Sequence, residues 1–351
     1  MEELLGTVSP LTETEDEFES KSLHWSLKWL VRIVAVSLIV FSFMMESFGP
    51  VTSLIVLFIL VVPLEKIFPR HKGQPVRRKH WRLDINYALA APAMAAIGGA
   101  FTIAIGILSL AWIPGLLINP YVTQLMERYP TQMLWTSVLL FDFLVYWTHR
   151  FYHEIEYLWP FHAIHHSTEH LDWVSGFRAH PFDGSLIAPA FFFLVAAGFD
   201  PTLTGAIVVV QVILGLFLHA NVNIRLRILH PIIMTPDFHH WHHSNYREAI
   251  WTNYSTFLPI WDIIFGTYYM PKVRPHTYGI DQEVPDNIVQ QFLMPIKGLG
   301  NPLKSIRHPI RSMKLVLKFI FKRFIPDMYK TATRKRGVTP FRAPDIPDLK
   351  L

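Results

Sequence analysis

Long apolar stretches alternate with short polar loops along the chain. The apolar runs lie at residues 29–48, 51–64, 87–117, 133–147, 186–198 and 203–218. A helix needs about 20 apolar residues to cross a ~30 Å hydrocarbon core, so some of these runs can span it while others are short. The pattern predicts an all-α, multispanning membrane helical bundle of about four full spans plus a short or re-entrant hairpin.

Turn residues and basic loops indicate how these apolar runs are oriented across the membrane. Gly49 and Pro50 separate the first two runs, and the sequence FDPTLTG at 199–205 separates the last two. The loop at 69–82, PRHKGQPVRRKHWR, is strongly basic and is expected to remain cytoplasmic by the positive-inside rule. With a polar loop at 119–132 on the other side, the pattern predicts cytoplasmic termini and a cytoplasmic, histidine-rich helical cap.

Three parts of the chain differ in composition. Residues 1–28 form an acidic tail without the basic start and apolar run of a secretory signal peptide. Residues 29–296 are expected to form the membrane-embedded domain, with a catalytic region at about 140–270. Residues 297–351 form a basic tail in which cationic and apolar residues alternate at helical spacing, as in an interfacial amphipathic helix. A solvated charged face over a packed domain is the alternative for this tail.

Composition narrows the chemistry. A hydrophobic fraction of 51% and a mean hydropathy of +0.27 are typical of a lipid-embedded protein. The net charge of +5 comes from basic residues beside apolar runs, which indicates membrane topology and no nucleic-acid partner. The absence of cysteine excludes disulfides, thiolate zinc sites and iron–sulfur clusters. Any metal must therefore bind nitrogen or oxygen ligands, and 18 histidines are present to supply them.

The histidines gather in three boxes. An HxxxH pair places both rings on one helix face, but such a pair is expected by chance about once in this chain. Two HxxHH triples, HAIHH at 162–166 and HHWHH at 239–243, are expected by chance only about 0.05 times each. Prolines just before both triples favour helix starts there. The predicted metal ligands in the three boxes are His149, His153, His162, His165, His166, His239, His242 and His243.

Eight clustered histidines exceed the three or four ligands of one zinc ion, so two metals are expected. Each triple can hold one metal or bridge two. The metal centre itself is the expected catalytic element, and no pattern indicates the substrate-binding residues. A solvated, basic boundary patch for anionic lipid headgroups is the alternative interpretation of these histidines.

Further residues are candidates beside the boxes. His180 in FRAHPF and His219 in LHANVN are possible additional ligands, although each is also compatible with a lone core or boundary histidine. Asn223 lies four residues after His219 and offers an oxygen. His240 points ~100° away from its neighbour on a helix and is expected to face outward.

An acidic residue inside an apolar run also needs explaining. Asp142 lies seven residues before His149, almost on the same helix face, where an ionised carboxylate is costly without a partner. It is expected to orient a ligand histidine or Arg178. Second-shell roles are also open for Glu169 and Asp172, beside helix capping or loop solvation.

The boxes WTHRFYH, FHAIHHS and HHWHHS, followed by TNYSTFLPIWDIIFGTY, resemble the membrane fatty acid hydroxylase and sterol desaturase superfamily over about residues 142–268. FRAHPFD at 177–183 is also similar. The resemblance implies two iron ions bound by the boxes on the cytoplasmic side, O2 as co-substrate and no bound organic cofactor. Some relatives carry a histidine where this chain has Asn223. A fused cytochrome b5 domain is missing, which implies a separate electron donor of cytochrome b5 or ferredoxin type with its reductase.

The predicted function is an O2-dependent di-iron oxidoreductase that hydroxylates or desaturates a C–H bond of a sterol, fatty acyl chain or related lipid within the bilayer. Its location would be the endoplasmic reticulum in a eukaryote or the inner membrane in a bacterium. One alternative is a zinc-dependent membrane hydrolase, which usually carries an HExxH motif that is missing here. Another is a non-enzymatic haem or metal-binding membrane protein, in which paired histidines would face each other within the bilayer.

Overall fold

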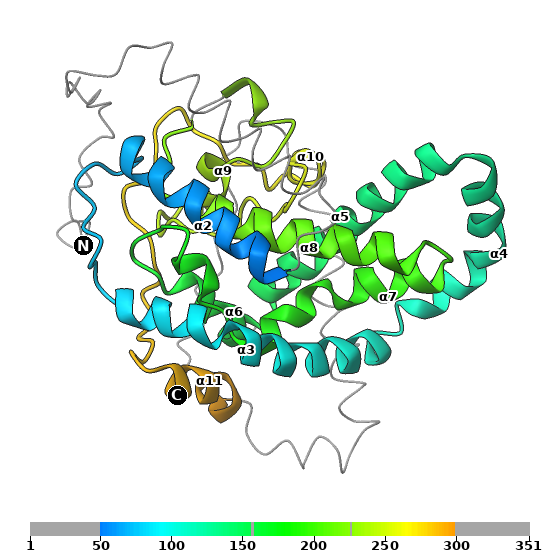
Figure 1. Cartoon of the computed structure of the whole chain (residues 1–351), viewed down its shortest axis with the longest axis horizontal. Coiled ribbons are helices and arrows are strands. Elements are labelled where there is room, and N and C mark those ends of the chain that lie inside the picture. Colours follow the sequence, from blue (N-terminus) through cyan, green and yellow to red (C-terminus); the bar gives the residue numbers. More distant parts are fainter. Residues whose placement is uncertain (1–49, 156–157, 225–226, 299–351) are drawn as a thin grey trace, which may run out of the picture.

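The computed structural model describes residues 50–155, 158–224 and 227–298, and these parts contain helices but no strands beyond two isolated bridges (Figure 1). The expected all-α class is therefore confirmed for them. The predicted apolar run at 29–48 and nearly all of the basic C-terminal tail lie outside the described residues. The elements are, in chain order, α2 (Pro50–Ile67), α3 (Trp81–Leu108), α4 (Trp112–Arg128), α5 (Pro130–Glu154), α6 (Trp159–His166), η1 (Ser175–Phe177), η2 (Pro181–Ile187), α7 (Ala188–Ala196), α8 (Pro201–Leu218), η3 (Arg227–Leu229), α9 (Pro236–His242), α10 (Ile260–Ile264) and α11 (Ile288–Gly298).

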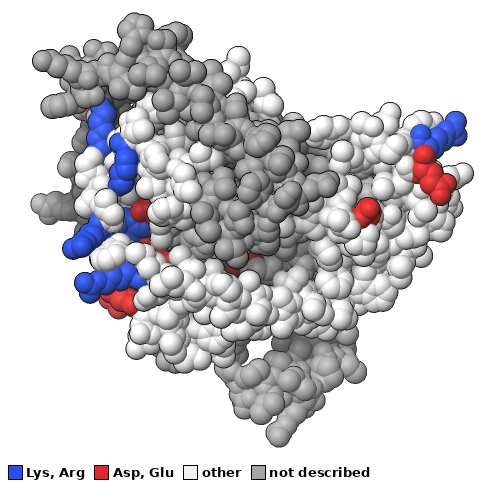
Figure 2. All heavy atoms as spheres, viewed as in Figure 1, with Lys and Arg blue, Asp and Glu red and all other residues white. Residues whose placement is uncertain are grey.

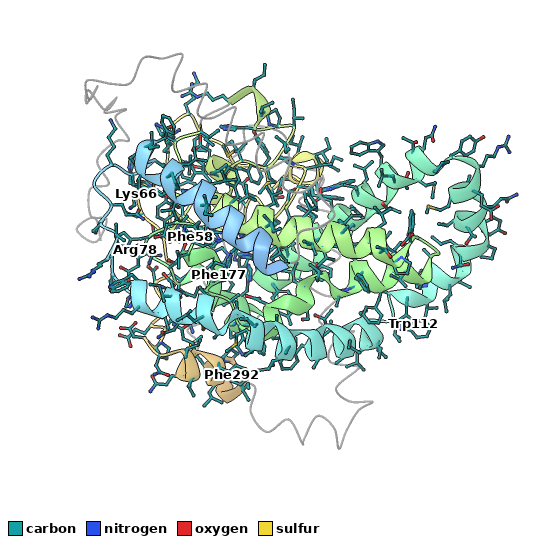
Figure 3. The ribbon with its side chains drawn as sticks, viewed as in Figure 1. Phe58, Lys66, Arg78, Trp112, Phe177 and Phe292 are labelled. Atoms are coloured by element: carbon teal, nitrogen blue, oxygen red, sulfur yellow. The ribbon has the colours of Figure 1, made fainter. Side chains whose placement is uncertain are left out.

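Two of the described helices, α3 and α8, are long and apolar enough to cross a membrane by length and composition. This finding is consistent with a helical membrane protein. Figure 2 shows charged side chains gathered at one end of the visible face and at the tip of the α4–α5 region, with few on the described surface between them. Lys66 and Arg78 lie at the first end, and Trp112 lies far from them, where α4 begins (Figure 3).

The segment between α3 and α5 differs from the prediction. Residues 119–132 were expected to form a polar loop, but most of them belong to α4, and α5 begins at Pro130 directly after it. The long apolar run also breaks at Ser109–Ala111, where Leu110 adopts a left-handed φ of 55°. Helix α4 and the start of α5 thus form a helical hairpin that extends from the rest (Figure 1).

The predicted hairpin at 186–218 is present as α7 and α8. Asp200 accepts hydrogen bonds from the backbone N–H groups of Thr202 and Leu203, and Pro201 occupies the first turn, so α8 has a capped start. Helix α7 packs against α3, α4, α5 and α8. The buried core between α5 and α7 is formed by Phe141, Val145, Ala190 and Leu194, among others. This core holds α5 in place, and α5 carries the first histidine box.

A close approach between α3 and α7 fixes their relative position. A Cβ atom at Gly106 would lie 2.2 Å from the Phe192 ring, and one at Gly98 would lie 2.9 Å from the Pro181 carbonyl oxygen. Real side chains cannot occupy such positions, so glycine is required for this packing. This contact positions η2 and the segment before it, and that segment lies beside the second histidine box.

Buried ion pairs join the basic loop to that same segment. Arg78 pairs with Asp84 and Asp172, and Arg178 pairs with the other carboxylate oxygen of Asp84, each at 2.6 Å. Buried charges are tolerated only with such partners. The network fixes the backbone around Arg178, whose carbonyl oxygen contacts the Nδ1 atom of His165.

Candidate metal centre

Four elements deliver the candidate histidines. His149 and His153 lie in the last turns of α5, and His219 is the residue that ends α8. The two HxxHH triples lie on the short helices α6 and α9, each of which has proline in its first turn, as the sequence predicted. The side chain of Thr235 caps α9 by accepting a hydrogen bond from the Phe238 N–H at 3.3 Å.

The candidate ligand atoms converge in two groups, within each of which all of them lie within 4.8 Å of one another. Each HxxHH triple contributes histidines to both groups. The five-histidine group consists of His149, His153, His162, His166 and His242, and the four-histidine group consists of His165, His219, His239 and His243.

The two groups adjoin each other. The rings of His166 and His243, one from each group, stack with centroids 4.2 Å apart and planes 18° from parallel. His162 and His165, also from different groups, have ring centroids 5.2 Å apart. The nine histidines therefore form one centre with two neighbouring sites.

Hydrogen bonds in the four-histidine group determine which ring nitrogen is available. The Nδ1 atom of His165 lies 3.0 Å from the Arg178 carbonyl oxygen, and that of His219 lies 2.6 Å from the Gly215 carbonyl oxygen. A carbonyl oxygen only accepts, so both Nδ1 atoms carry the proton and both Nε2 atoms present a lone pair. The Nε2 atom of His219 nevertheless lies 3.2 Å from that of His165. Two lone pairs cannot form a hydrogen bond, but they can share a cation.

The five-histidine group repeats this pattern. The Nδ1 atoms of His149 and His242 contact the carbonyl oxygens of Tyr254 and Thr252, at 2.7 and 2.9 Å. The Nδ1 atom of His162 contacts a carboxylate oxygen of Asp183 at 3.1 Å. Metal-bound histidines usually donate their second N–H in this way.

Several Nε2 atoms in this group are buried without a hydrogen-bond partner among the described residues, namely those of His153, His166 and His242. An unsatisfied buried polar atom costs about 1–3 kcal/mol. These three Nε2 atoms belong to one group of converging ligand atoms, so a bound metal ion would satisfy all three and offset this cost.

The spacing of the nitrogens fits metal coordination. Metal–imidazole bonds of about 2.0–2.1 Å place neighbouring ligand nitrogens roughly 3 Å apart. The Nε2 atoms of His219, His239 and His243 are separated by 3.1–3.2 Å, and those of His149 and His162 by 3.1 Å. The residues present therefore fit two metal ions with nitrogen ligands.

Burial keeps these imidazoles in the form that binds metal. It lowers the pKa of His242 to about 3 and that of His219 to about 4, and it holds the pKa of His166 and His243 well below the usual 6.5. Neighbouring histidines lower the pKa of His166 and His243 further, since a second positive charge nearby is unfavourable. At neutral pH these rings are uncharged, as metal ligands must be.

Two further candidate ligands, His180 and Asn223, have hydrogen-bond partners of their own. The Nδ1 atom of His180 accepts a hydrogen bond from the Phe182 N–H, and its Nε2–H donates to the Phe292 carbonyl, both at 3.0 Å. His180 thus caps η2, stacks on Phe292 of α11 and belongs to neither histidine group, which favours the core-histidine alternative over the ligand. The side-chain oxygen of Asn223 accepts a hydrogen bond from Arg274 at 2.8 Å, and its role as an oxygen ligand stays a prediction.

Asp142 acts on the backbone and not on a histidine or Arg178. Its carboxylate accepts hydrogen bonds from the N–H groups of Phe257 and Leu258, at 2.9 and 3.1 Å, and from the Trp261 indole at 2.9 Å. This anchors the segment that follows Tyr254. The candidate second-shell residues Glu169 and Asp172 pair with Lys79 and Arg78 instead.

Sequence reasoning missed the groups that orient the rings. Asp183, at the end of FRAHPFD, was given no role, although the motif was noted. The carbonyls of Thr252 and Tyr254 carry no side-chain signal. His240 lies outside both groups as expected, but it is buried and not outward-facing, with its Nδ1 atom 3.2 Å from the Tyr278 hydroxyl.

Comparison with known proteins gives the lineage of this centre. The sequence model of the fatty acid hydroxylase family matches residues 134–267. The chain is 31% identical to ornithine lipid hydroxylase OlsE of Rhizobium tropici over 267 residues, which cover 71% of this chain and 74% of that protein. It is also 29% and 32% identical to the alkylglycerol monooxygenases of Xenopus tropicalis and Homo sapiens, over 46% and 43% of this chain and 36% and 34% of theirs.

No solved structure matches the chain. The chain spans about a third of the length of the alkylglycerol monooxygenases but three quarters of the ornithine lipid hydroxylase. The matched residues 134–267 include all nine histidines of the two groups. The family match, the relative matched along most of both chains and the box sequences agree, and the chain belongs to the fatty acid hydroxylase family.

Proposed function

We propose that this protein is a di-iron, O2-dependent hydroxylase that inserts oxygen into a C–H bond of a polar lipid. The observation that carries the proposal is the convergence of nine histidines into two adjoining groups. Family members that match this chain are named as lipid hydroxylases and monooxygenases, so an oxidation of a lipid is the chemistry they share. Iron, bound by these histidines, supplies the activation of O2 that amino-acid side chains cannot perform.

The chain's own residues have three tasks in this proposal. The five-histidine and four-histidine groups are the proposed ligands of the two irons. Asp183 and the backbone carbonyls hold the Nδ1 protons, so that every oriented ring presents its Nε2 lone pair inward. The burial of the rings excludes bulk water, which prevents protonation of the ligands and competing reactions of a strong oxidant.

The substrate class follows from the relatives and the setting. An ornithine lipid and an alkylglycerol both join a polar headgroup to a long hydrocarbon chain. We infer a polar lipid of this kind, with its hydrocarbon chain reaching the centre, and hydroxylation as the outcome. A free sterol has no counterpart in the names of the three relatives compared above.

The expected membrane setting belongs to the same proposal. Helices α3 and α8 supply candidate spans. We infer that residues 29–296 are the membrane-embedded domain, with the centre on its cytoplasmic side. The membrane is the endoplasmic reticulum or the bacterial inner membrane, depending on the source. Each turnover needs two electrons besides O2, which a separate cytochrome b5 or ferredoxin-type donor with its reductase delivers.

The proposal is tested by comparing lipid extracts from cells that express the wild-type protein, His166→Ala or a matched His276→Ala control under 18O2. His276 is exposed and lies in neither histidine group. We expect one lipid class to gain a single 18O atom in wild-type and control cells but not with His166→Ala. A new double bond without 18O would indicate desaturation, and no lipid difference between wild type and His166→Ala would contradict lipid oxidation.

A further inference from the structure

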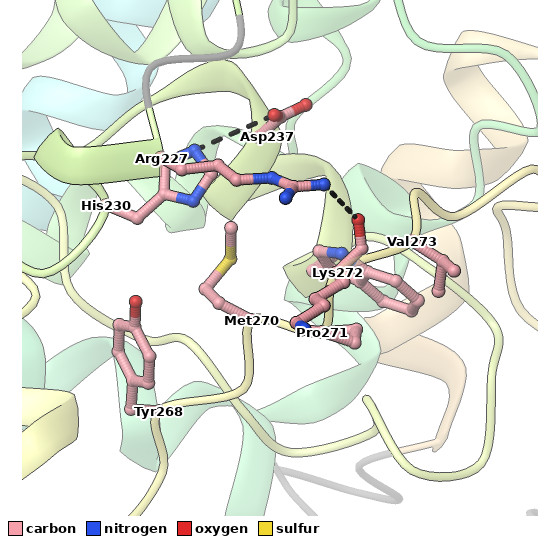
Figure 4. Close-up of a pocket in the computed structure, with 9 residues that line it drawn as sticks. Arg227, His230, Asp237, Tyr268, Met270, Pro271, Lys272 and Val273 are labelled. Carbon is pink, nitrogen blue, oxygen red and sulfur yellow. Dashed lines mark hydrogen bonds and ion pairs between the residues drawn. The ribbon is translucent and has the colours of Figure 1, made fainter. Parts of the chain in front are cut away.

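A cavity of about 150 Å³ lies beside α9, away from the metal centre (Figure 4). Its lining residues are Arg227, His230, Asp237, Trp241, Tyr268, Met270, Pro271, Lys272 and Val273. Asp237 and Trp241 are four residues apart and share one face of α9. The histidines of α9 in the two groups lie about 140–240° around the helix from Asp237, so the cavity and the metals occupy opposite sides of it.

The cavity carries an excess of positive charge. Asp237 is the only acid among the described lining residues, and its carboxylate is already paired with Arg70 and with Arg274, which lies 3.3 Å away. Arg227 and Lys272 add two further cations to the wall. The Arg227 guanidinium donates to the Lys272 carbonyl oxygen at 3.2 Å, which holds these two basic residues side by side (Figure 4). An anion is the complementary ligand.

Guanidinium and ammonium groups together suit one anion in particular. Arginine presents a planar fork of N–H donors that matches two phosphate oxygens, and lysine adds a point charge. The cavity volume is sufficient for one phosphate group but not for a nucleotide. His230, which is buried on the same wall, has its Nε2 atom 3.7 Å from the Asp237 carboxylate (Figure 4).

Exposed apolar side chains that neighbour Arg227 in the chain favour a lipid over a soluble anion. Ile228, Ile232 and Ile233 follow Arg227 closely in the chain, and their side chains are 78%, 59% and 45% exposed. A group of exposed isoleucines next to cationic residues is typical of a segment that enters the membrane interface. A free phosphate ion gains nothing from such residues, whereas a lipid can lay its hydrocarbon chain on them.

We propose that this cavity binds the phosphate headgroup of an anionic lipid, with the hydrocarbon chain leaving over Ile228 and Ile232. The site is separate from the oxidation site and needs no metal, so it goes beyond the proposed function. Because Asp237 and Trp241 belong to α9, an occupied cavity also restrains the helix that presents His239, His242 and His243. A bound lipid therefore stabilises α9 on the side opposite its metal-site histidines.

The experiment uses the purified full-length protein in a neutral detergent. Binding of dihexanoyl phosphatidic acid, dihexanoylglycerol and inorganic phosphate is measured by isothermal titration calorimetry. The variants are R227Q/K272Q, I228S/I232S and the control R128Q, which removes a cation at the distant end of α4. The metal content of each variant is measured alongside, because unchanged metal shows that the fold is intact independently of lipid binding.

We expect phosphatidic acid to bind wild type and R128Q alike and R227Q/K272Q at least tenfold more weakly. I228S/I232S should weaken the lipid but not inorganic phosphate, and dihexanoylglycerol should not bind. If R227Q/K272Q fails to fold, the single variant K272Q, at an exposed position, tests the same cation and should bind severalfold more weakly. Equal binding by the cation variants overturns the site. Equal binding by I228S/I232S overturns the lipid and leaves only a soluble anion.

Discussion

The Nε2 atoms of His165 and His219 lie 3.2 Å apart although each presents a lone pair to the other. This arrangement is held by the backbone, since the Nδ1–H of His165 donates to Arg178 and that of His219 donates to Gly215. Without a cation between them, the two rings would repel each other. The contact is therefore a signature of the metal site that is visible from the hydrogen bonds alone.

Removing the carboxylate behind His162 should weaken one metal selectively. Asp183→Asn keeps the size of the side chain but removes the carboxylate charge that orients the His162 ring through its Nδ1 atom. Loss of such a partner lowers metal affinity about 10- to 100-fold. We expect faster loss of one of the two metals to a chelator, measured by metal analysis over time. Glu127→Gln, at an exposed position on α4, serves as the control and should match wild type.

Replacing His180 should affect stability and leave the metals in place. His180→Ala removes the cap on the Phe182 N–H and the hydrogen bond to the Phe292 carbonyl, which together contribute about 1–3 kcal/mol. We expect a lower unfolding temperature in detergent and an unchanged metal-to-protein ratio. A variant that loses one metal while keeping the wild-type unfolding temperature would show that His180 is a ligand after all.

Asp142→Asn should disturb the centre through the backbone. The amide keeps one oxygen but turns N–H donors toward the N–H groups of Phe257 and Leu258 or the Trp261 indole. We expect destabilisation of about 1–3 kcal/mol in urea titrations, with partial loss of metal because the neighbouring carbonyls of Thr252 and Tyr254 shift. Thr256→Ala removes only the weakest of these contacts, at 3.2 Å, and should have a much smaller effect.

The stability of the metal-free protein should depend on pH in a defined direction. The pKa of His242 is lowered to about 3 and that of His219 to about 4, whereas in the unfolded chain both are near 6.5. Between these values the unfolded state binds more protons, so stability is present above pH 6.5 and decreases as the pH falls below it. Each group contributes about 1.4 kcal/mol per pH unit. After chelation, the unfolding temperature should fall from pH 7.5 to pH 5.5, and a constant or rising value would contradict neutral, buried rings.

The packing of α3 on α7 allows a matched pair of substitutions. Gly106→Ala places a Cβ atom 2.2 Å from the Phe192 ring, whereas Gly99→Ala on the same helix meets nothing within 4 Å. Overpacking costs about 1–3 kcal/mol, while alanine in an open helical position is favourable by up to about 1 kcal/mol. Unfolding temperatures should therefore fall for the first variant and rise slightly for the second. Equal effects would show that α3 does not approach α7 as described.

The sequence allowed the centre to be predicted better than its surroundings. His162, His165 and His166 share a pattern with His239, His242 and His243 that chance does not explain, and helical spacing alone places each triple on one face. The division of each triple between two groups depends on tertiary packing, which spacing cannot reveal. His180 fits the same composition, but its tautomer is reversed by Phe182 and Phe292, contacts that arise only in the fold.

Polarity misled the prediction at α4. Residues 119–132 contain polar and charged side chains and were expected to form a loop, but residues up to Arg128 continue helix α4. The side chain of Asn119 in α4 donates a hydrogen bond to the Ala196 carbonyl oxygen of α7. His240 was expected to face outward because its neighbours face the metals. In the structure, His240 is covered by residues from outside α9, including Tyr278. The sequence pattern of one helix does not show which other segments pack against it.

The central claim is that the nine histidines hold two iron ions, and metal analysis tests it most directly. The wild-type protein, purified anaerobically from iron-supplied cells, is measured by plasma mass spectrometry and Mössbauer spectroscopy beside His219→Ala and His276→Ala. We expect two non-haem irons per chain in the wild type and the His276→Ala control, and about one in His219→Ala, which disrupts only the four-histidine group. A single zinc, a haem absorption band, or the same metal content in His219→Ala would contradict the account.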